Sequence, residues 1–326
     1  MNSSTATKIL AAWLLGISMP LLAGSSSDAG HWLERMSAAM SQMCYQGTFV
    51  YVQGDEVETM RITHVSDEDG VRERLVSVSG AQREILRDSN GVRWIKGDDH
   101  SVMEDPSFGR SFFPEIPMAP TDESSVSYRF EVGDKERIAG HSGRNVKIIP
   151  RDHFRYGYNL WLEEQSALLL KWELLDNKQQ GLAKLMFTEL NLGSEVDLKE
   201  LESASQLKEF KTLESSLPSS RSLTNSNPSW QASKLPPGFR LTAHRYLGKQ
   251  DQGIYEHLVY SDGLAAVSIY VESNRDGLEE KDTGISKMGT THAFSRLFDN
   301  VLITVVGDVP AVTVKSIGIS VKSVAR

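Results

Sequence analysis

The chain has a single cysteine, Cys44, among its 326 residues. One cysteine cannot form an intramolecular disulfide, so packing rather than covalent cross-linking must hold the fold together. Cys44 also lies well inside the chain, where it cannot become the lipid-bearing N-terminal residue of a mature lipoprotein. A lone cysteine is usually a small buried apolar residue, and we expect no redox role for it.

The sequence also lacks the common catalytic and metal-binding motifs. It contains no His-Glu-x-x-His, Cys-x-x-Cys, phosphate-binding loop or Gly-x-Ser-x-Gly. Gly140-His141-Ser142-Gly143 is one residue short of the last of these and falls in an expected hairpin turn, which argues against Ser142 as a nucleophile. The eight histidines are never spaced four residues apart, so a zinc site has little support. We therefore predict no catalytic residue, no metal site and no cofactor.

Positive charge is scarce in the first two thirds of the chain. From Gly24 to Pro228 there are 23 Lys and Arg residues against 33 Asp and Glu residues, a net charge of −10. From Ser229 to Arg326 the counts are 11 and 10, a net charge of +1. Nucleic acid requires a basic surface, so it is excluded as a partner of the acidic first part. An anionic partner would be attracted only to the second part.

The apolar run at the N-terminus is too short to span a membrane. Ile9–Leu22 has about 14 residues, contains a proline, follows Lys8 and precedes Ala23, whereas a spanning helix needs about 20 residues. Its order of cation, apolar core and small residue is that of a secretory signal peptide. We predict that residues 1–23 are a signal peptide cleaved after Ala23, with cleavage after Ala29 as the alternative, and that the protein is exported.

Hydrophobic periodicity predicts a helix followed by a long antiparallel meander. Apolar residues at helical spacing predict one amphipathic helix over 28–43. Alternating segments separated by Gly, Asp and Asn turn residues then predict strands that pair with their neighbours. We expect strands at 48–52, 58–63, 72–78, 83–87, 92–96, 128–133, 136–139, 144–150, 156–164, 167–176 and 181–192, followed by a helix over 197–210. This pattern predicts a large curved sheet in an N-terminal domain, 24–211.

A stretch rich in Ser, Asn and Pro, 212–229, predicts a linker to a second domain, 230–326. Within that domain we expect two hairpins, 254–260 with 264–272 and 292–298 with 301–306. The apolar spacing after Asp308 predicts a helix with Asp308 as its N-cap.

The segment 104–125 interrupts the strand pattern with four prolines and three phenylalanines. Long loops in compact domains are often functional, and this one is expected at the surface. Two interpretations remain open: the loop packs down on the sheet, or it forms a lid over an apolar cavity that binds lipid. The candidate lid residues are Phe108, Phe112, Phe113, Ile116 and Met118.

Six basic side chains of the second domain are candidates for partner binding. They form either an ordinary solvated face or a patch that binds an anionic partner or an acidic peptide. The candidates are Arg240, Arg245, Lys249, Lys287, His292 and Arg296.

Several stretches together resemble the RseB/MucB family. In the first domain they run from Arg155-Tyr156-Gly157-Tyr158 to Leu174-Leu175-Asp176. In the second they are Trp230 with Leu235-Pro236-Pro237-Gly238-Phe239, then Tyr260-Ser261-Asp262-Gly263-Leu264, and Ile303 through Pro310. Their order, their spacing and the position of the linker make the resemblance specific, and it covers essentially the whole mature chain.

The resemblance implies a fold and a function. The fold is α+β: an N-terminal open antiparallel β-barrel with helices, like LolA and LolB, and a small C-terminal α/β sandwich-like domain. The function is periplasmic negative regulation of the sigma-E (AlgU-type) envelope stress response. Such a regulator binds the periplasmic domain of an RseA/MucA-type anti-sigma factor and shields it from the site-1 protease, and lipid or lipopolysaccharide releases the shield. Homo-oligomers are also implied.

One departure from the family and two alternative functions remain. The family is more basic just before the second hairpin of the C-terminal domain, where this chain has Ser286–His292 with one lysine. Binding of lipopolysaccharide by charge therefore has less support here. The main alternative function is a periplasmic lipid or lipoprotein carrier. An exported hydrolase is disfavoured by the missing motifs.

Overall fold

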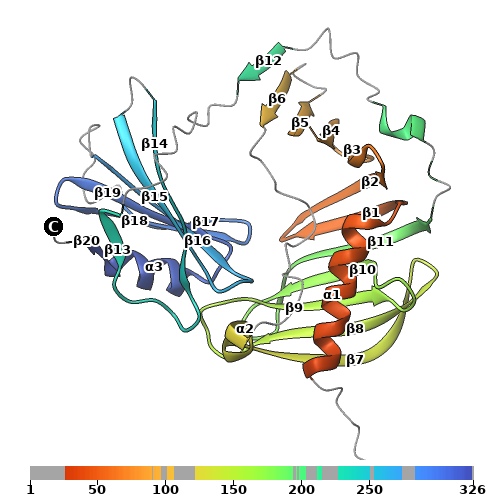
Figure 1. Cartoon of the computed structure of the whole chain (residues 1–326), viewed down its shortest axis with the longest axis horizontal. Helices are drawn as coiled ribbons and strands as arrows, with labels where there is room; N and C mark the ends of the chain where they lie inside the picture. The colour runs from red at the N-terminus through yellow and green to blue at the C-terminus, as the bar shows by residue number, and fades with distance from the viewer. Residues whose placement is uncertain are drawn as a thin grey trace, which may run out of the picture.

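The computed structural model describes residues 26–89, 91–96, 101–105, 122–193, 196, 198–202, 211–214, 227–249, 253–273 and 283–324. The predicted signal peptide and all five candidate lid residues lie outside the described residues. The described part of the chain forms two lobes side by side, each built on its own sheet (Figure 1).

The N-terminal lobe is a curved sheet of twelve strands in the order β12-β6-β5-β4-β3-β2-β1-β11-β10-β9-β8-β7 (Figure 1). Neighbouring strands pair antiparallel, except that β12 and β6 pair parallel. The strands are β1 Tyr45–Gln53, β2 Glu56–Asp67, β3 Gly70–Ser77, β4 Arg83–Asp88, β5 Gly91–Lys96, β6 Ser101–Asp105, β7 Tyr128–Ile138, β8 His141–Pro150, β9 Gly157–Glu163, β10 Leu169–Leu175, β11 Gly181–Leu192 and β12 Lys211–Glu214.

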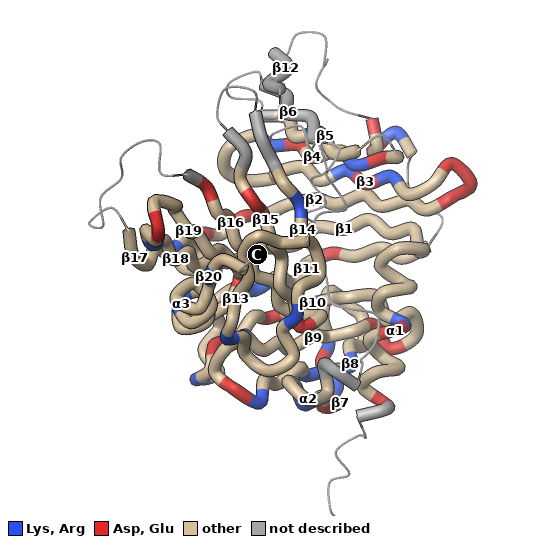
Figure 2. The backbone as a smooth tube through the Cα atoms, turned by 60° about the vertical axis from the view of Figure 1, so that its left-hand side comes forward, with Lys and Arg blue, Asp and Glu red and all other residues tan. Residues whose placement is uncertain are grey.

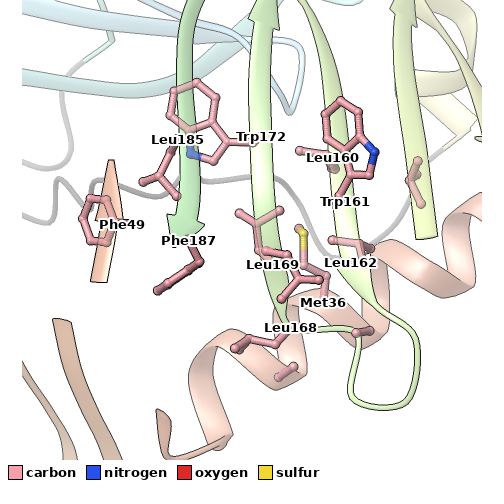
Figure 3. Close-up of a cluster of buried hydrophobic side chains, with 14 of the residues drawn as sticks. Met36, Phe49, Leu160, Trp161, Leu162, Leu168, Leu169, Trp172, Leu185 and Phe187 are labelled. Atoms are coloured by element: carbon pink, nitrogen blue, oxygen red, sulfur yellow. The ribbon is translucent and has the colours of Figure 1, made fainter. Parts of the chain in front are cut away.

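Helix α1, Ser26–Gln42, packs against one face of this sheet, chiefly over β7. Leu33, Met36 and Ala39 recur at helical spacing and are all buried. Figure 3 shows Met36 against the leucines of β9 and β10, including Leu162 and Leu169. Burying one such side chain contributes about 1.5–3 kcal/mol, so this apolar face, rather than helix propensity, holds α1 in place.

The C-terminal lobe is a six-stranded antiparallel sheet in the order β14-β15-β16-β19-β18-β17. Its strands are β14 Arg240–Lys249, β15 Gly253–Ser261, β16 Ala266–Ser273, β17 Gly284–Met288, β18 Thr291–Phe298 and β19 Val301–Gly307. Helix α3, Ala311–Ser320, covers one face through Val314 and Ile317. A two-stranded sheet of β13, Trp230–Ala232, and β20, Val321–Ser323, closes the lobe.

The predicted α+β class, with an open antiparallel barrel and a smaller C-terminal lobe, is confirmed. The larger sheet is open because its strand order has two ends, β12 and β7. Both predicted hairpins of the second lobe form, as β15–β16 and β18–β19. No helix in the described part of the chain is long and apolar enough to cross a membrane.

Several local predictions are wrong. Residues 128–133 and 136–139 are one strand, β7, because a register shift between Val132 and Lys135 absorbs the extra residues without breaking the pairing with β8. Residues 122–125, expected in a loop, belong to the short helix α2, Asp122–Ser127. In the helix expected over 197–210, Leu198–Leu201 form a 3-10 turn, and 203–210 lie outside the described residues.

The predictions also fail at two places in the C-terminal lobe. Pro310 is the N-cap of α3 and makes no side-chain cap bond, whereas the Asp308 carboxylate accepts a 2.5 Å hydrogen bond from the Thr291 hydroxyl. Strand β17 was not predicted: its residues are all exposed, so it has no alternation of buried apolar and exposed polar positions.

Candidate functional site

The two lobes meet through loops that lie far apart in the sequence. Gln53 Nε2, in the N-terminal lobe, donates to the Thr290 hydroxyl over 3.3 Å at the turn between β17 and β18. Gly289 precedes Thr290 with a φ of +59°, and a Cβ there would lie 2.6 Å from the Gln53 side chain. The backbone of this turn therefore favours glycine, and a side chain there would displace the Gln53 amide.

Tyr156 and His292 form the second contact between the lobes. The Tyr156 hydroxyl lies 3.3 Å from His292 Nδ1, which is also 2.8 Å from the Val309 carbonyl oxygen. Because that carbonyl can only accept, Nδ1 carries the proton and donates to it. Burial, with Asp308 adding to it, raises the pKa of Tyr156 to about 12, so this phenol is neutral near pH 7.

Arg155 is the centre of the third contact, and its side chain is wholly buried. Its guanidinium pairs with Asp152 in its own lobe and with Asp262 of the other lobe. Nη2 also donates to the Pro237 carbonyl oxygen over 2.7 Å. The guanidinium carbon lies 5.2 Å from the ring centre of Phe239 and 5.2 Å from that of Tyr128.

Beside these contacts, a groove of about 850 Å³ opens between the lobes. Three turns line it, between β1 and β2, between β10 and β11, and between β17 and β18. Met288 on its wall is 80% exposed, an unusual position for a large apolar side chain. The groove carries both signs of charge, from Asp55, Glu56, Glu173, Lys184 and Lys287.

The structure does not bring the six candidate basic residues together. Arg240, Arg245 and Lys249 are on β14, and Lys287 is on β17, at the opposite edge of the same sheet. Arg240, Arg245 and Lys287 are exposed. In the described part of the chain, Lys and Arg are spread over both lobes rather than gathered on the second (Figure 2).

The remaining two candidates have internal roles. Arg296 donates to the Gly318 and Val321 carbonyl oxygens over 2.9 and 2.6 Å and lies over the Phe298 ring. It therefore ties α3 to the sheet. His292 donates to Val309 within its lobe, as described above. Of the six, only Lys287 and His292 lie at the junction between the lobes.

Sequence reasoning did not single out Arg155, Tyr156 or Asp262 as functional residues. A signal was present, because the four stretches that carry the family resemblance all reach the junction. Arg155 and Tyr156 come from the first, Pro237 and Phe239 from the second, Asp262 from the third, and Val309 from the fourth.

Comparison with proteins of known sequence identifies relatives along the whole chain. The Sigma factor AlgU regulatory protein MucB of Pseudomonas aeruginosa is 29% identical over 315 residues, which are 95% of each chain. The Sigma-E factor regulatory protein RseB of Escherichia coli K12 is 24% identical over 306 residues, 92% of each chain.

Three solved structures of MucB are also similar. A crystal structure of MucB in complex with MucA(peri) gives a TM-score of 0.71 at 28% identity, covering 93% of this chain and 100% of that one. The Pseudomonas aeruginosa MucA/MucB complex gives 0.70 at 28% identity, covering 92% and 100%. MucB solved alone gives 0.60 at 28% identity, covering 92% and 99%.

Family models match both lobes. The MucB/RseB N-terminal domain matches residues 28–205, and the MucB/RseB C-terminal domain matches residues 224–322. Together they cover most of the chain, which belongs to the MucB/RseB family.

Proposed function

We propose that the chain is a periplasmic negative regulator of a sigma-E-type envelope stress response. It binds the periplasmic domain of a membrane-bound anti-sigma factor and shields that domain from the site-1 protease. The observation that carries the proposal is the similarity, over 93% of this chain, to a MucB that was solved with the periplasmic part of MucA. Export follows from the N-terminal signal peptide, cleaved near Ala23.

The groove between the lobes is the binding site that we propose for the partner. It is hollow, lies where both lobes contribute, and exposes Met288 beside Lys287 at the end of an edge strand. Edge strands offer unpaired backbone groups, and extended peptides bind such edges by adding a strand. An extended segment of the anti-sigma factor that binds there contacts both lobes at once.

The test is proteolysis in vitro. The purified mature chain is mixed with the periplasmic domain of the anti-sigma factor, and the rate of cleavage by the site-1 protease is measured. The proposal requires that cleavage slow as the chain is titrated in. A cleavage rate that stays the same at saturating chain concentrations would refute it.

A pair of matched variants tests the groove. Met288→Asp places a charge on the groove wall, whereas Ile319→Asp makes the same change on α3, at a position 57% exposed outside the groove. We expect the first variant to lose protection of the anti-sigma domain and the second to keep it. Equal protection by both variants would exclude the groove as the binding site.

The carrier alternative requires an apolar hollow on the sheet face under α1. In the described residues that face is filled by buried side chains, including Leu33, Phe49 and Phe187. Figure 3 shows part of this cluster, with Met36, Leu162, Leu168 and Leu169 close together beside α1. No observation on the described residues favours the carrier, and release by lipid remains a prediction from the family resemblance.

A further inference from the structure

We propose that the buried pair Arg155–Asp262 is a latch that fixes the two lobes in the arrangement that binds the anti-sigma factor. The two residues act by positioning the lobes and do not themselves touch the partner. The identity of the bound partner rests on the proposed function, whereas the evidence for the latch comes from the contacts between the lobes.

Hydrogen bonds within the N-terminal lobe fix the orientation of the Arg155 side chain. Nε donates to Asp152 Oδ1 over 3.1 Å, and Nη2 donates to Asp152 Oδ2 over 3.0 Å. This fork of two bonds fixes the plane of the guanidinium. Nη1 and Nη2 then reach across the junction, to Asp262 Oδ2 and to the Pro237 carbonyl oxygen.

Asp262 is equally held by the C-terminal lobe. Its Oδ1 accepts hydrogen bonds from the backbone N–H groups of Leu264 and Ala265 over 2.9 and 2.7 Å, in the turn between β15 and β16. Its Oδ2 therefore points out of the lobe, where it accepts from Arg155 and, over 3.1 Å, from the Tyr128 hydroxyl. Each half of the pair is preorganised before the lobes meet.

Burial makes this pair sensitive to how the lobes are placed. The side chains of Arg155 and Asp262 are both 0% exposed. Charges removed from water are stabilised only by close, well-directed partners, so a small slide of one lobe leaves both charges buried and poorly paired. A full separation returns both to water. The pair therefore favours one arrangement of the lobes over its close neighbours.

Two other hydrogen bonds across the junction are weaker in kind. Ser127 Oγ donates to the Pro237 carbonyl over 3.1 Å, and Thr313 Oγ1 donates to the Phe154 carbonyl over 2.6 Å. These bonds join neutral groups, whereas bonds between charged groups are about twice as strong. Interfaces between domains of one chain commonly allow movement unless something specific prevents it. At this junction the charged pair is the specific element.

The solved relatives differ in how closely they match this chain. At the same 28% identity and nearly equal coverage, the chain fits the two MucB structures with MucA better than it fits MucB alone. The structure in which Arg155 meets Asp262 is thus more similar overall to the two structures that contain the partner.

The test uses the mature chain with two latch variants and two matched controls. Arg155→Met and Asp262→Asn break the pair. Asp262→Asn keeps a side-chain oxygen that can accept the backbone hydrogen bonds of the turn. Arg74→Met removes another buried arginine, paired with Glu84 over 2.6 Å inside the N-terminal lobe. Asp67→Asn changes a turn aspartate that also pairs with an arginine, Arg72, within that lobe.

Three quantities are measured for each protein: the small-angle scattering profile, the Kd for the periplasmic domain of the anti-sigma factor, and the circular dichroism spectrum. We expect both latch variants to stay folded, to show a larger maximum dimension, and to bind about tenfold or more weakly, because the competent arrangement becomes a minority. Both controls keep the wild-type scattering profile and affinity.

Other outcomes overturn the latch. Wild-type scattering in both latch variants means that the pair does not hold the lobes. Unchanged scattering with weakened binding means that the residues contact the partner directly. Expanded scattering with unchanged affinity means that the arrangement does not matter for binding. If Arg155→Met is unfolded by circular dichroism, Asp262→Asn alone decides, since it retains the turn.

The latch and the proposed function fail in different ways. Failure of the wild-type chain to bind the anti-sigma domain removes the proposed function, while the scattering of the latch variants still decides whether the pair fixes the lobes. Binding by wild type with no change in the latch variants removes only the latch.

Discussion

The Tyr156 hydroxyl of the N-terminal lobe lies 3.3 Å from His292 Nδ1 of the C-terminal lobe. The same hydroxyl lies 3.5 Å from the Thr290 carbonyl oxygen, which can only accept a hydrogen bond. One phenol thus connects its own lobe to the start of β18 and to the turn before it. Tyr156 and Arg155 are adjacent in the sequence, so the same segment of the N-terminal lobe makes both contacts.

Tyr156→Phe removes the hydroxyl and leaves the ring. We expect the loss of about 1 kcal/mol from the contact between the lobes, because a neutral hydrogen bond contributes that much on average. Binding of the anti-sigma domain should weaken as well, by at most about fivefold. Tyr246→Phe is the control, because that hydroxyl bonds Ser229 within the C-terminal lobe at 2.9 Å. A control that weakens binding as much as Tyr156→Phe would show that the junction is not responsible.

Alanine variants of Gly238 and Gly263 distinguish the effect of backbone strain from the effect of a contact between the lobes. Both have positive φ, +81° and +97°, so alanine is strained at either position. A Cβ on Gly238 would also lie 2.6 Å from the Ser127 hydroxyl oxygen across the junction, whereas a Cβ on Gly263 meets nothing within 4 Å.

We therefore expect Gly238→Ala to weaken binding of the anti-sigma domain and Gly263→Ala to leave it near the wild-type value. Titration calorimetry of the two variants gives the comparison. Similar affinities for both would mean that the close approach at Gly238 has no consequence for function.

Gly318→Ala should destabilise the C-terminal lobe, although alanine normally favours a helix over glycine by about 1 kcal/mol. A Cβ at this position in α3 would lie 2.4 Å from Cδ1 of the Phe294 ring, which is buried. Forcing that contact costs about 1–3 kcal/mol. Lys315→Ala, at an exposed position of the same helix, should change stability by less than about 0.5 kcal/mol. Urea unfolding distinguishes the two, and a stabilised Gly318→Ala would contradict the packing described here.

His257 gives the C-terminal lobe a pH dependence. Burial lowers the pKa of His257 to about 4, with Arg245 and His244 acting in the same direction. Its ring stacks on Tyr270, with centres 4.5 Å apart. Between pH 6.5 and 4 the unfolded chain binds a proton at this histidine and the folded chain does not, so stability falls as the pH falls through that range.

The expected loss is about 1–2 kcal/mol, reduced from the full linkage value because the ring is partly exposed to solvent. His257→Leu should flatten the difference in unfolding free energy between pH 7 and pH 4.5, while His31→Gln, at an exposed position of α1, should not. The same pH slope in His257→Leu and in wild type would show that another group is responsible.

Much of the fold could be predicted because some strands, such as β1 and β11, alternate buried and less buried residues along part of their length. In β1 the pattern from Tyr45 to Phe49 is of this kind, and short turns fix the antiparallel pairing. Strand β17 could not be predicted, since an edge strand with no buried side chain has no hydrophobic signal. Strand β7 was divided because its register shift interrupts the alternation.

The candidate site was harder to predict than the fold. The grouping of Arg240 with Lys287 assumed that basic residues of one lobe share a surface, but strand order places β14 and β17 at opposite edges. Arg155 and Asp262 are 107 residues apart, and no local pattern reports that they meet. Such a contact depends on how two lobes dock, which a single sequence does not encode in its periodicity.

The most direct measurement is a calorimetric titration of the purified mature chain with the isolated periplasmic domain of the anti-sigma factor. We predict a saturable, stoichiometric complex that elutes as one species in size-exclusion chromatography and forms less readily with Met288→Asp. Absence of any saturable complex between the two folded proteins would contradict it.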